Sequence, residues 1–518
     1  MKLANLCLVA TALAACHCAH ESRVTSVRRD VHEPGPEVPP PAGAISVKSF
    51  GAKGDGATDD RAAFQAALDA AASGNAELYV PPGTYVIDAQ PRALFGLAIR
   101  GTVHLRGAGQ DRTVLQQAAG AHPSARLINV SGDRVVIEDL TLDGNRAAQQ
   151  PGEQRHGLFI TDTGELEVRR VTARNFTGDG FYLYHNASGS RFTQVVATGN
   201  GRNGLTLGGM VNHTEILDSK FVGNTAQQVD SEPGGNNVVS NTTITGSLLD
   251  NAGASKDYAL TCSGTGGAKG HDWTVTHNTI NGPIFIVWAD HVTIADNTGT
   301  NVAPKSFITI NRSSSDITIR HNKLVQAQRD AAFQAGVYVV GTKGSSPERI
   351  LITDNDIETT FERGYGVRAT GATSIEITGN RLRGAGRPAA GFAGIYLRAT
   401  LLDRDFRSAV MRGNTIRNFG ELGVSVVGNG AAKLLSVDVS NNTFEDDSAV
   451  PSMTTAISLD DGSGAAQKVQ VDGNTFKRGV RDRVINYPAH AIREGRGDAD
   501  DRDGPAPAPE VRDHRDPR

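Results

Sequence analysis

The stretch Gly336-Val337-Tyr338-Val339 is followed by Ile352-Thr353-Asp354-Asn355, and both patterns return as Gly366-Val367-Arg368-Ala369 and Ile377-Thr378-Gly379-Asn380. Each pattern alternates apolar and polar residues with a period of two, which predicts a β-strand. The first begins after a glycine and the second ends at an asparagine. The chain therefore restates a unit that contains more than one strand.

Working outward, the same unit covers most of the chain. From Leu158 to Ile457 there are eleven steps over 299 residues, or about 27 residues per step. Several short strands per step exclude a helical solenoid and indicate a parallel β-helix. The asparagines are predicted to be structural, because Asn tolerates left-handed backbone at turns and stacked copies can bond side chain to side chain. They stand at positions 278, 322, 355, 380, 414, 442 and 474.

Composition and charge limit the function. The 518 residues include 59 glycines, 38% apolar residues and 21% charged residues, with a formal net charge of −4. This balance excludes a nucleic-acid binder driven by bulk positive charge. No apolar run reaches the roughly 20 residues of a spanning helix, which excludes a polytopic membrane protein. Four cysteines are too few for a disulfide scaffold.

The two ends differ in composition from the repeats. Residues 1–15 have the pattern of a signal peptide, and Leu13-Ala14-Ala15-Cys16 resembles the lipobox of bacterial lipoproteins. This resemblance implies lipidation of Cys16 and an extracytoplasmic, cell-envelope location; an ordinary secretory signal is the alternative. Residues 16–44 are proline-rich and predict a tether. Residues 45–490 form the predicted repeat domain, and 491–518 are predicted to be a disordered charged tail.

The start of the repeat domain carries a family resemblance. Phe50-Gly51-Ala52-Lys53-Gly54-Asp55-Gly56-Ala57-Thr58-Asp59-Asp60 precedes a helical run from Arg61 to Ala72, and Tyr79–Tyr85 and Leu105–Gly109 follow. These motifs resemble the pectate-lyase-like β-helix superfamily, with its rhamnogalacturonase-like and epimerase-like members. The resemblance implies a polysaccharide-active, all-β, single-stranded right-handed parallel β-helix of about 12 or more coils. The helix is expected to cap the open end, and Asp55, Asp59 and Asp60 to be turn and cap residues.

One outward column of the predicted solenoid is rich in aromatic, basic and acidic residues. Its centre is Asp230 and Glu232, which lie two apart on one strand and are both expected to project outward. Small neighbours, with Thr206 and Gly208 before them and Ala259 and Thr261 after, predict hollows on either side. Two carboxyls can act as acid plus nucleophile or acid plus base in glycoside cleavage. Solvated acids paired with Lys256 are the alternative.

Other residues of this face complete the predicted site. Tyr184 and His185 could serve as base and acid in β-elimination, and His156 and Asp179 lie at its rim, where His156 could shuttle a proton. Aromatic rings and arginines are expected to bind sugar rings and carboxylates. The predicted substrate-binding residues are Phe159, Tyr182, Phe285, Trp288, Asn311, Tyr338, Arg368, Tyr396 and Arg398.

The catalytic motifs of two relatives are not matched. Mannuronan epimerases carry Tyr-Gly-Phe-Asp-Pro-His, whereas the nearest stretch here is Asp179-Gly180-Phe181-Tyr182-Leu183-Tyr184. Polygalacturonases carry an acidic pair where Asn203 stands here. We therefore expect a lyase or glycoside hydrolase acting on an acidic polysaccharide, with a C5-epimerase or a non-catalytic glycan-binding protein as alternatives.

The expected partners follow from this interpretation. A polysaccharide is the expected partner, and a membrane is contacted only through the lipid anchor. No cofactor is required by the proposed chemistry, while turns rich in Asp and Asn are compatible with Ca²⁺.

Overall fold

The structure is a computed structural model. It describes residues 42–89, 94–253, 257–327, 334–399, 406–428, 434–460, 468–480, 482–485, 492–494 and 499–500. All of them belong to one compact unit, Val38–Arg518. The predicted signal, Cys16 and almost all of the tether lie outside the described residues.

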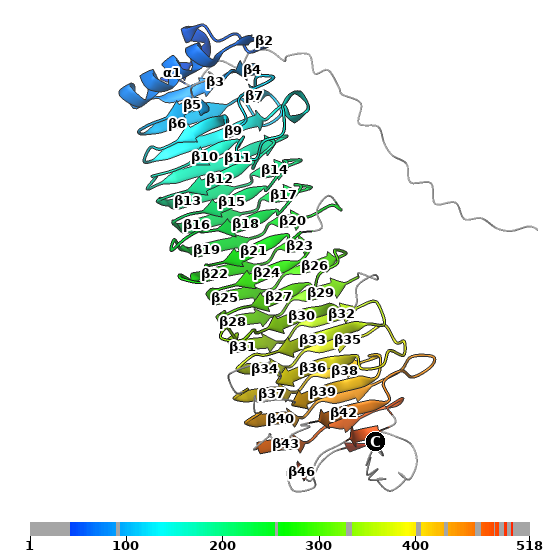
Figure 1. The fold of residues 1–518 in the computed structure, drawn as a ribbon. Coiled ribbons are helices and arrows are strands. Elements are labelled where there is room, and N and C mark those ends of the chain that lie inside the picture. The colour runs from blue at the N-terminus through cyan, green and yellow to red at the C-terminus, as the bar shows by residue number, and fades with distance from the viewer. Residues whose placement is uncertain are drawn as a thin grey trace, which may run out of the picture. The chain divides into compact units, whose positions relative to one another are not determined.

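The described part of this unit is a parallel β-helix, in which successive coils stack their strands in register (Figure 1). One sheet, here called the site sheet, contains 15 parallel strands. Its strands are β5 Phe95–Ile99, β8 Arg126–Val130, β10 Leu158–Ile160, β12 Phe181–Tyr184, β15 Leu205–Gly208, β18 Val229–Glu232, β21 Leu260–Ser263, β24 Ile284–Val287, β27 Ile308–Asn311, β30 Gln334–Val340, β33 Gly364–Thr370, β36 Ala393–Ala399, β39 Leu422–Gly428, β42 Thr455–Asp460 and β45 Asp482–Ile485. The prediction of about 12 or more coils is confirmed.

Two further columns of strands complete each coil. The second column contains β1 Ile45–Ser46, β3 Glu77–Val80, β6 Val103–Gly107, β9 Val135–Asp143, β11 Leu166–Arg174, β13 Ala187–Thr193, β16 Val211–Leu217, β19 Val239–Thr245, β22 Gly270–Thr276, β25 Ala289–Ala295, β28 Ser315–Arg320, β31 Glu348–Thr353, β34 Ser374–Thr378, β37 Ser408–Arg412, β40 Ser436–Ser440, β43 Lys468–Asp472 and β46 Ile492–Glu494. The third contains β2 Asp55–Asp59, β4 Gly83–Ile87, β7 Thr113–Gln117, β14 Val196–Thr198, β17 Lys220–Val222, β20 Leu248–Asp250, β23 Thr279–Asn281, β26 Thr298–Asn301, β29 Lys323–Gln326, β32 Asp356–Thr359, β35 Arg381–Arg383, β38 Thr415–Arg417, β41 Thr443–Glu445, β44 Thr475–Phe476 and β47 Ala499–Asp500. The long strands β9 and β11 contribute to both columns.

The core follows from the period of two. Inward residues of every strand are apolar and buried, for example Leu158 and Ile160 in β10. Stacking places each inward side chain about 4.8 Å from its equivalent in the next coil, so one apolar column runs through the solenoid. The outward neighbours are thereby free to carry polar and aromatic side chains.

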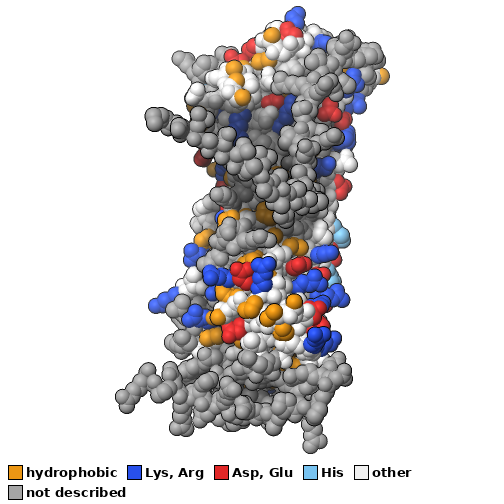
Figure 2. All heavy atoms as spheres, turned by 90° about the vertical axis from the view of Figure 1, so that its right-hand side faces the viewer, with side chains coloured by type: hydrophobic (Ala, Val, Ile, Leu, Met, Phe, Trp, Pro, Cys, Tyr) orange, Lys and Arg blue, Asp and Glu red, His pale blue; other side chains and the backbone are white. Residues whose placement is uncertain are grey.

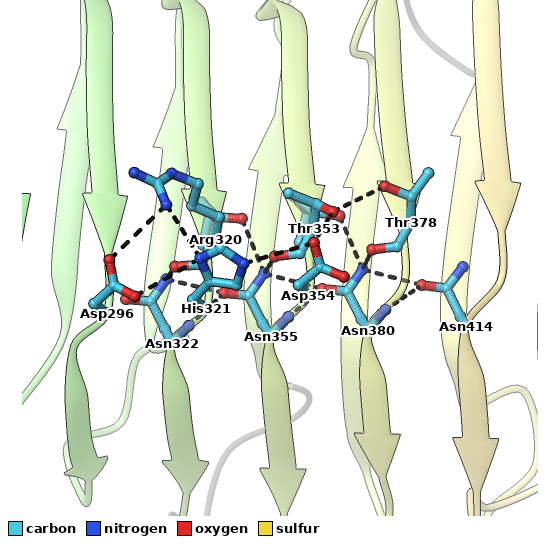
Figure 3. A network of polar contacts seen from close by, with 12 residues as sticks. Asp296, Arg320, His321, Asn322, Thr353, Asp354, Asn355, Thr378, Asn380 and Asn414 are labelled. Carbon is cyan, nitrogen blue, oxygen red and sulfur yellow. Dashed lines mark hydrogen bonds and ion pairs between the residues drawn. The ribbon is translucent and has the colours of Figure 1, made fainter.

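A ladder of buried asparagines connects the coils between the second and third columns. The amide nitrogen of each side chain donates to the Oδ1 of the next asparagine at 2.9–3.1 Å, and the backbone N–H donates to the same oxygen. Figure 3 shows the segment from Asn322 through Asn355 and Asn380 to Asn414. The ladder runs over residues 278, 297, 322, 355, 380, 414, 442 and 474. The structural role predicted for the asparagines is confirmed.

The predicted reason for asparagine is only half correct. The residue before each ladder asparagine, not the asparagine, has left-handed backbone, as in His321 (φ 53°), Asp354 (φ 54°) and Gly379 (φ 65°). The preceding residue makes the turn, while the side chain of the asparagine points inward and bonds to the asparagines of the neighbouring coils. Glycine adopts this backbone readily because it has no Cβ, and aspartate and histidine adopt it more often than most other residues.

The N-terminal helix α1 Arg61–Gly74 buries Phe64, Ala67, Leu68 and Ala71 in the same core. Short 3-10 helices are η1 Val47–Phe50 and η2 Arg146–Ala148. Figure 1 shows α1 beside the first strands of the solenoid. The helix is present as predicted, and its capping function stays a prediction.

The acidic residues before α1 have separate contacts. The Asp55 carboxylate accepts the backbone N–H groups of Ala57 and Thr58, which is the expected turn. Asp60 makes no side-chain bond to the helix; its carboxylate accepts the N–H groups of Lys53 and Gly54 instead. The prediction of a helix cap at Asp60 is therefore wrong, because the chain folds back and brings the Lys53–Gly54 turn within reach.

The C-terminal boundary also differs from the prediction. The strands β46 and β47 pair with β43 and β44. Backbone pairing therefore continues past residue 490, since an edge strand offers unpaired N–H and C=O groups to the chain that follows. No helix in the described residues is long and apolar enough to cross a membrane.

The described surface mixes charges of both signs. On the face in Figure 2, basic and acidic side chains stand interspersed, with apolar side chains between them. This matches the formal net charge of −4.

We predict that Asn355→Ala destabilises the solenoid by roughly 3–5 kcal/mol. The buried backbone N–H of Asn322 loses its acceptor, the Asn322 amide loses one of its three acceptors, and Asn380 Oδ1 loses its side-chain donor. Asp354→Gly is the matched control, since glycine already occupies the equivalent left-handed turns at Gly379 and Gly413. Urea denaturation of both variants measures the effect. Equal shifts would show that the turn, rather than the ladder, sets stability.

Candidate functional site

Strand register fixes the outward column of the site sheet. Phe159 pairs with Tyr182, Tyr182 with Thr206, and Thr206 with Asp230. The sequence prediction is wrong for the next strand. Val229 pairs with Leu260, so the outward neighbour of Asp230 in the next coil is Thr261 and not Ala259. The coil that contains residues 251–259 has a longer loop, which shifts the apparent repeat by two residues.

A row of polar side chains lies just before these strands. His156, Asp179 and Asn203 precede β10, β12 and β15, and all three are completely buried. The prediction that His156 and Asp179 lie at an accessible rim is therefore wrong. Their side chains bond to neighbouring coils: the Asp179 N–H donates to His156 Nδ1 at 3.1 Å, and the Asn203 N–H donates to Asp179 Oδ1 at 2.9 Å.

Arg202 connects the carboxyl groups of the site. Its Nη1 donates to Asp179 Oδ2 at 2.9 Å and its Nη2 donates to Glu232 Oε2. Sequence reasoning missed this residue. The signal was available, because Arg202-Asn203-Gly204 occupies the position of Gly178-Asp179-Gly180 one coil earlier. Its two partners come from the coils on either side of its own, so only folding brings the three residues together.

Asp230 and Glu232 differ in exposure, contrary to the prediction that both project into solvent. Asp230 is 2% exposed, whereas the Glu232 side chain is 41% exposed. Asn203 Nδ2 donates to Asp230 Oδ2 at 3.2 Å. Asp230 is covered because the polar row lies beside it. Glu232 pairs with Arg202, while Lys256 lies outside the described residues.

Burial and charge set the protonation of this cluster. Burial raises the pKa of Asp179 to about 7, even though Arg202 opposes the shift. Burial and the adjacent Glu232 carboxylate hold the pKa of Asp230 well above its usual range. Burial, with the positive charges of Arg126 and Arg202, lowers the pKa of His156 to about 3. The cluster therefore holds a neutral imidazole and at least one protonated carboxyl at neutral pH.

Aromatic rings form the surface beside this cluster. Phe159, Tyr182 and Tyr184 lie with ring centroids 5.4–6.0 Å apart. The Tyr182 ring lies over Gly208, where an added Cβ would come within 2.7 Å of it. The hollow predicted at Gly208 is thus filled by Tyr182. Burial and the nearby carboxylates raise the pKa of Tyr182 to about 12, so its hydroxyl stays protonated.

The exposed groups of the site are Tyr184 and His185. Tyr184 is 42% exposed, and the His185 side chain is 57% exposed with left-handed backbone (φ 49°). His185 Nδ1 lies 3.3 Å from Asp162 Oδ1. Asn186 Nδ2 also lies 3.3 Å from His185 Nδ1, so both polar contacts of the ring are made at Nδ1. Among the described residues Nε2 has no hydrogen-bond partner, which leaves it to a ligand. Asp162, which the sequence analysis did not single out, therefore orients His185.

The remaining predicted binding residues occupy the same sheet but form separate groups. Phe285 stacks on Tyr258 at 4.6 Å, and Trp288 lies under Arg312. Asn311 accepts the Arg312 N–H, which is a turn contact. The third group lies farther along the sheet, where the Arg368 guanidinium faces the rings of Tyr338, Tyr365 and Tyr396 at 5.0–5.5 Å. Arg398 lies opposite Thr370 in the next strand.

A groove of about 880 Å³ lies elsewhere, along the second column from β9 to β25. Arg134, Glu167, His213 and Asp272 are among its lining residues, and none of the predicted site residues is. In the part of the chain that the structure describes, no three His, Cys, Asp or Glu side chains are grouped to hold a metal ion.

The fold and the polar face together define a right-handed β-helix of the pectate-lyase type. A family model described as "Rhamnogalacturonase A/epimerase, pectate lyase-like" matches residues 44–304, and one for the "Right handed beta helix region" matches residues 334–487. The chain belongs to the rhamnogalacturonase A/epimerase, pectate lyase-like family.

Particular relatives cover only part of the chain. Mannuronan C5-epimerase AlgE6 from Azotobacter vinelandii is 35% identical over 181 residues, which is 31% of this chain and 20% of that protein. Alginate lyase 7 from the same organism is 32% identical over 178 residues, again 31% of this chain and 20% of the relative. The chain thus spans a fifth of these curated relatives. The tailspike gp49 of Pseudomonas phage LKA1 has the same fold, with 13% identity, TM-score 0.58 and coverage of 82% and 84%.

The raised pKa values of Asp179 and Asp230 predict that removing one of these carboxyl groups changes stability by an amount that depends on pH. Asp230 and Asp179 hold protons in the folded state that the unfolded chain releases above about pH 4, so their contribution to stability falls as pH rises. Asp230→Asn removes one such group at equal size. We expect the difference in melting temperature, variant minus unmodified protein, to become more positive as the pH rises from about 5 to about 8. The lowered pKa of His156 makes its contribution to stability rise with pH. Because His156 is present in both proteins, this contribution cancels when the two melting temperatures are subtracted. A difference that stays constant with pH would contradict the buried, protonated Asp230.

Proposed function

We propose that this protein acts on a uronate-containing polysaccharide by moving the proton on the carbon α to the uronate carboxyl group. The observation that carries the proposal is the exposed pair Tyr184 and His185 beside a cluster of two buried carboxyl groups, Asp179 and Asp230, and the half-exposed Glu232, with the Arg202 guanidinium between them. Such an arrangement offers proton acceptors and donors at the surface and fixed charges behind them.

The relatives support this chemistry. They include C5-epimerases of mannuronan and an alginate lyase. Epimerisation at C5 and β-elimination can both begin with removal of the C5 proton of a uronate. One site can therefore serve either reaction, and the second proton transfer decides the product.

The exposed residues can divide these steps. His185 Nε2 takes the C5 proton, and the electron pair of the C–H bond moves toward the uronate carboxyl group. In elimination the C4–O4 bond then breaks and O4 takes the hydroxyl proton of Tyr184. In epimerisation the Tyr184 hydroxyl returns a proton to C5 from the opposite face, and exchange with solvent then restores Tyr184 and His185. The Asp162 carboxylate holds the imidazole in place.

The buried residues are positioning groups in this scheme. Arg202 fixes Glu232 at the edge of the cluster, where its exposed carboxylate can accept sugar hydroxyls. Asp179 and Asn203 hold Arg202 and Asp230 in place, and the neutral His156 packs 4.8 Å from the Tyr182 ring. None of these buried groups needs to touch the sugar.

Hydrolysis through Asp230 and Glu232 is less well supported. Glycosidases need two carboxyl groups that reach the scissile bond, one to protonate the leaving oxygen and one to act as nucleophile or to activate water. Here Asp230 is 2% exposed and bonded to Asn203, whereas only Glu232 is accessible. The predicted acid/base pair therefore presents one carboxyl group to a substrate instead of two.

The other aromatic and basic groups of the site sheet are proposed as distal subsites. The Phe285 and Trp288 groups lie two coils or more from Glu232, and the group around Arg368, Tyr338 and Tyr396 lies about five coils away, or roughly 24 Å. With Arg398 they provide faces for sugar rings and charges for carboxylates. An extracytoplasmic protein, lipidated at Cys16 or secreted, is part of the same proposal.

The direct test is incubation with polymannuronate and with other acidic polysaccharides in D₂O. Elimination gives ultraviolet absorbance of an unsaturated uronate, and epimerisation gives C5-inverted sugars that carry deuterium. We expect one of these products, and a loss of at least about 100-fold in rate for His185→Asn and for Tyr184→Phe. His213→Asn, another exposed left-handed histidine on the second column, is the matched control.

Two outcomes would contradict the proposal. New reducing ends without unsaturation or deuterium would establish hydrolysis. Binding of the polymer without any product would establish a glycan-binding protein.

A further inference from the structure

Arg126 lies at one end of the aromatic surface. It is the first residue of β8, and its guanidinium carbon lies 3.8 Å from the centroid of the Phe159 ring. The Phe159 ring in turn neighbours Tyr182 and Tyr184. The backbone of the next residue, Leu127, donates to the His156 carbonyl, which places Arg126 one coil before the polar row. The sequence analysis did not single out this residue.

The guanidinium of Arg126 has no acidic partner in the described part of the chain. No carboxylate there lies within 4.0 Å of it, and its Nε is buried without a hydrogen bond. The other arginines nearby are satisfied: Arg155 donates to the carbonyls of His122 and Ala121, and Arg202 to two carboxylates. Arg126 is thus a half-buried cation that has lost part of its hydration without gaining a counter-charge.

Such a group is costly unless a ligand supplies the missing charge. A guanidinium is planar and presents paired N–H donors, which match the two oxygens of a carboxylate. Phe159 holds one face of the guanidinium by cation–π contact, so its edge remains for an anion. Phe159 itself is buried, but the neighbouring Tyr184 ring is 42% exposed and offers an apolar surface to the sugar that carries that anion.

We propose that Arg126 binds the carboxylate of the sugar unit next to the one at Tyr184 and thereby selects acidic chains over neutral ones. This inference rests on the proposed function and assigns it a specificity residue. Arg126 does not take part in the proton transfers, because it lies beyond Phe159 from Tyr184 and His185. Its contribution is to binding and to the register of the chain.

The test compares binding of sodium alginate with binding of the same polymer after chemical reduction of its carboxyl groups. Isothermal titration calorimetry gives Kd for both polymers with the full chain, Arg126→Gln and Arg126→Lys. We expect Arg126→Gln to weaken alginate binding about 10- to 100-fold and to leave the reduced polymer unchanged. Arg126→Lys should lose less, because it keeps the charge but not the paired donors.

Arg191→Gln is the matched control, since Arg191 is paired with Glu215 on the second column and should leave both affinities unchanged. An equal loss for both polymers, or none for alginate, would overturn the role of Arg126, and melting temperatures identify a folding defect. If the unmodified protein binds alginate and Arg126→Gln binds it equally, only this inference fails. If the unmodified protein binds no acidic polymer, the proposed function fails with it.

Discussion

The hydrogen bond between stacked asparagines is the constraint on which the rest of the structure depends. Each such bond connects the turns of two successive coils at the spacing of β-strands. The side-chain oxygen of one asparagine accepts both the backbone N–H and the side-chain N–H of the asparagine one coil earlier, as Asn355 Oδ1 does from Asn322. The coils from Asn278 to Asn474 repeat this contact, and in the earlier coils Ser247 and Ser219 continue it through backbone N–H bonds to side-chain oxygens. Register is therefore held constant over many coils. A slip of one residue would bury polar side chains and expose apolar ones.

Constant register has a consequence for the site. A side chain placed outward on one strand lies about 4.8 Å from its equivalents on both neighbours. Residues 23 to 30 apart in sequence therefore become adjacent. Asp179, Arg202 and Glu232 meet in this way from three coils. The solenoid therefore builds a charged cluster from residues that no local motif contains, and its length provides a surface on which a polymer can extend.

Burial, more than residue identity, divides the roles within that cluster. Asp230 and Glu232 are two residues apart, yet one is covered and the other is half-exposed. The pKa of the covered carboxyl is raised, whereas the exposed one pairs with Arg202. The same contrast separates the buried His156 from the exposed His185. Accessible groups and groups that set the local charge are thus distinct, although both kinds stand in one row of strands.

The sequence by itself determined the β-helix, the ladder asparagines and most of the outward column, because period-two alternation and repeat spacing are local properties. It also indicated Tyr184, His185 and the acidic pair at Asp230 and Glu232. Only the tertiary structure decided that Asp179, His156 and Asp230 are buried, that Thr261 follows Asp230, and that Arg202 and Arg126 belong to the site. These facts depend on loop lengths and on contacts between coils, and neither leaves a periodic signal in the chain.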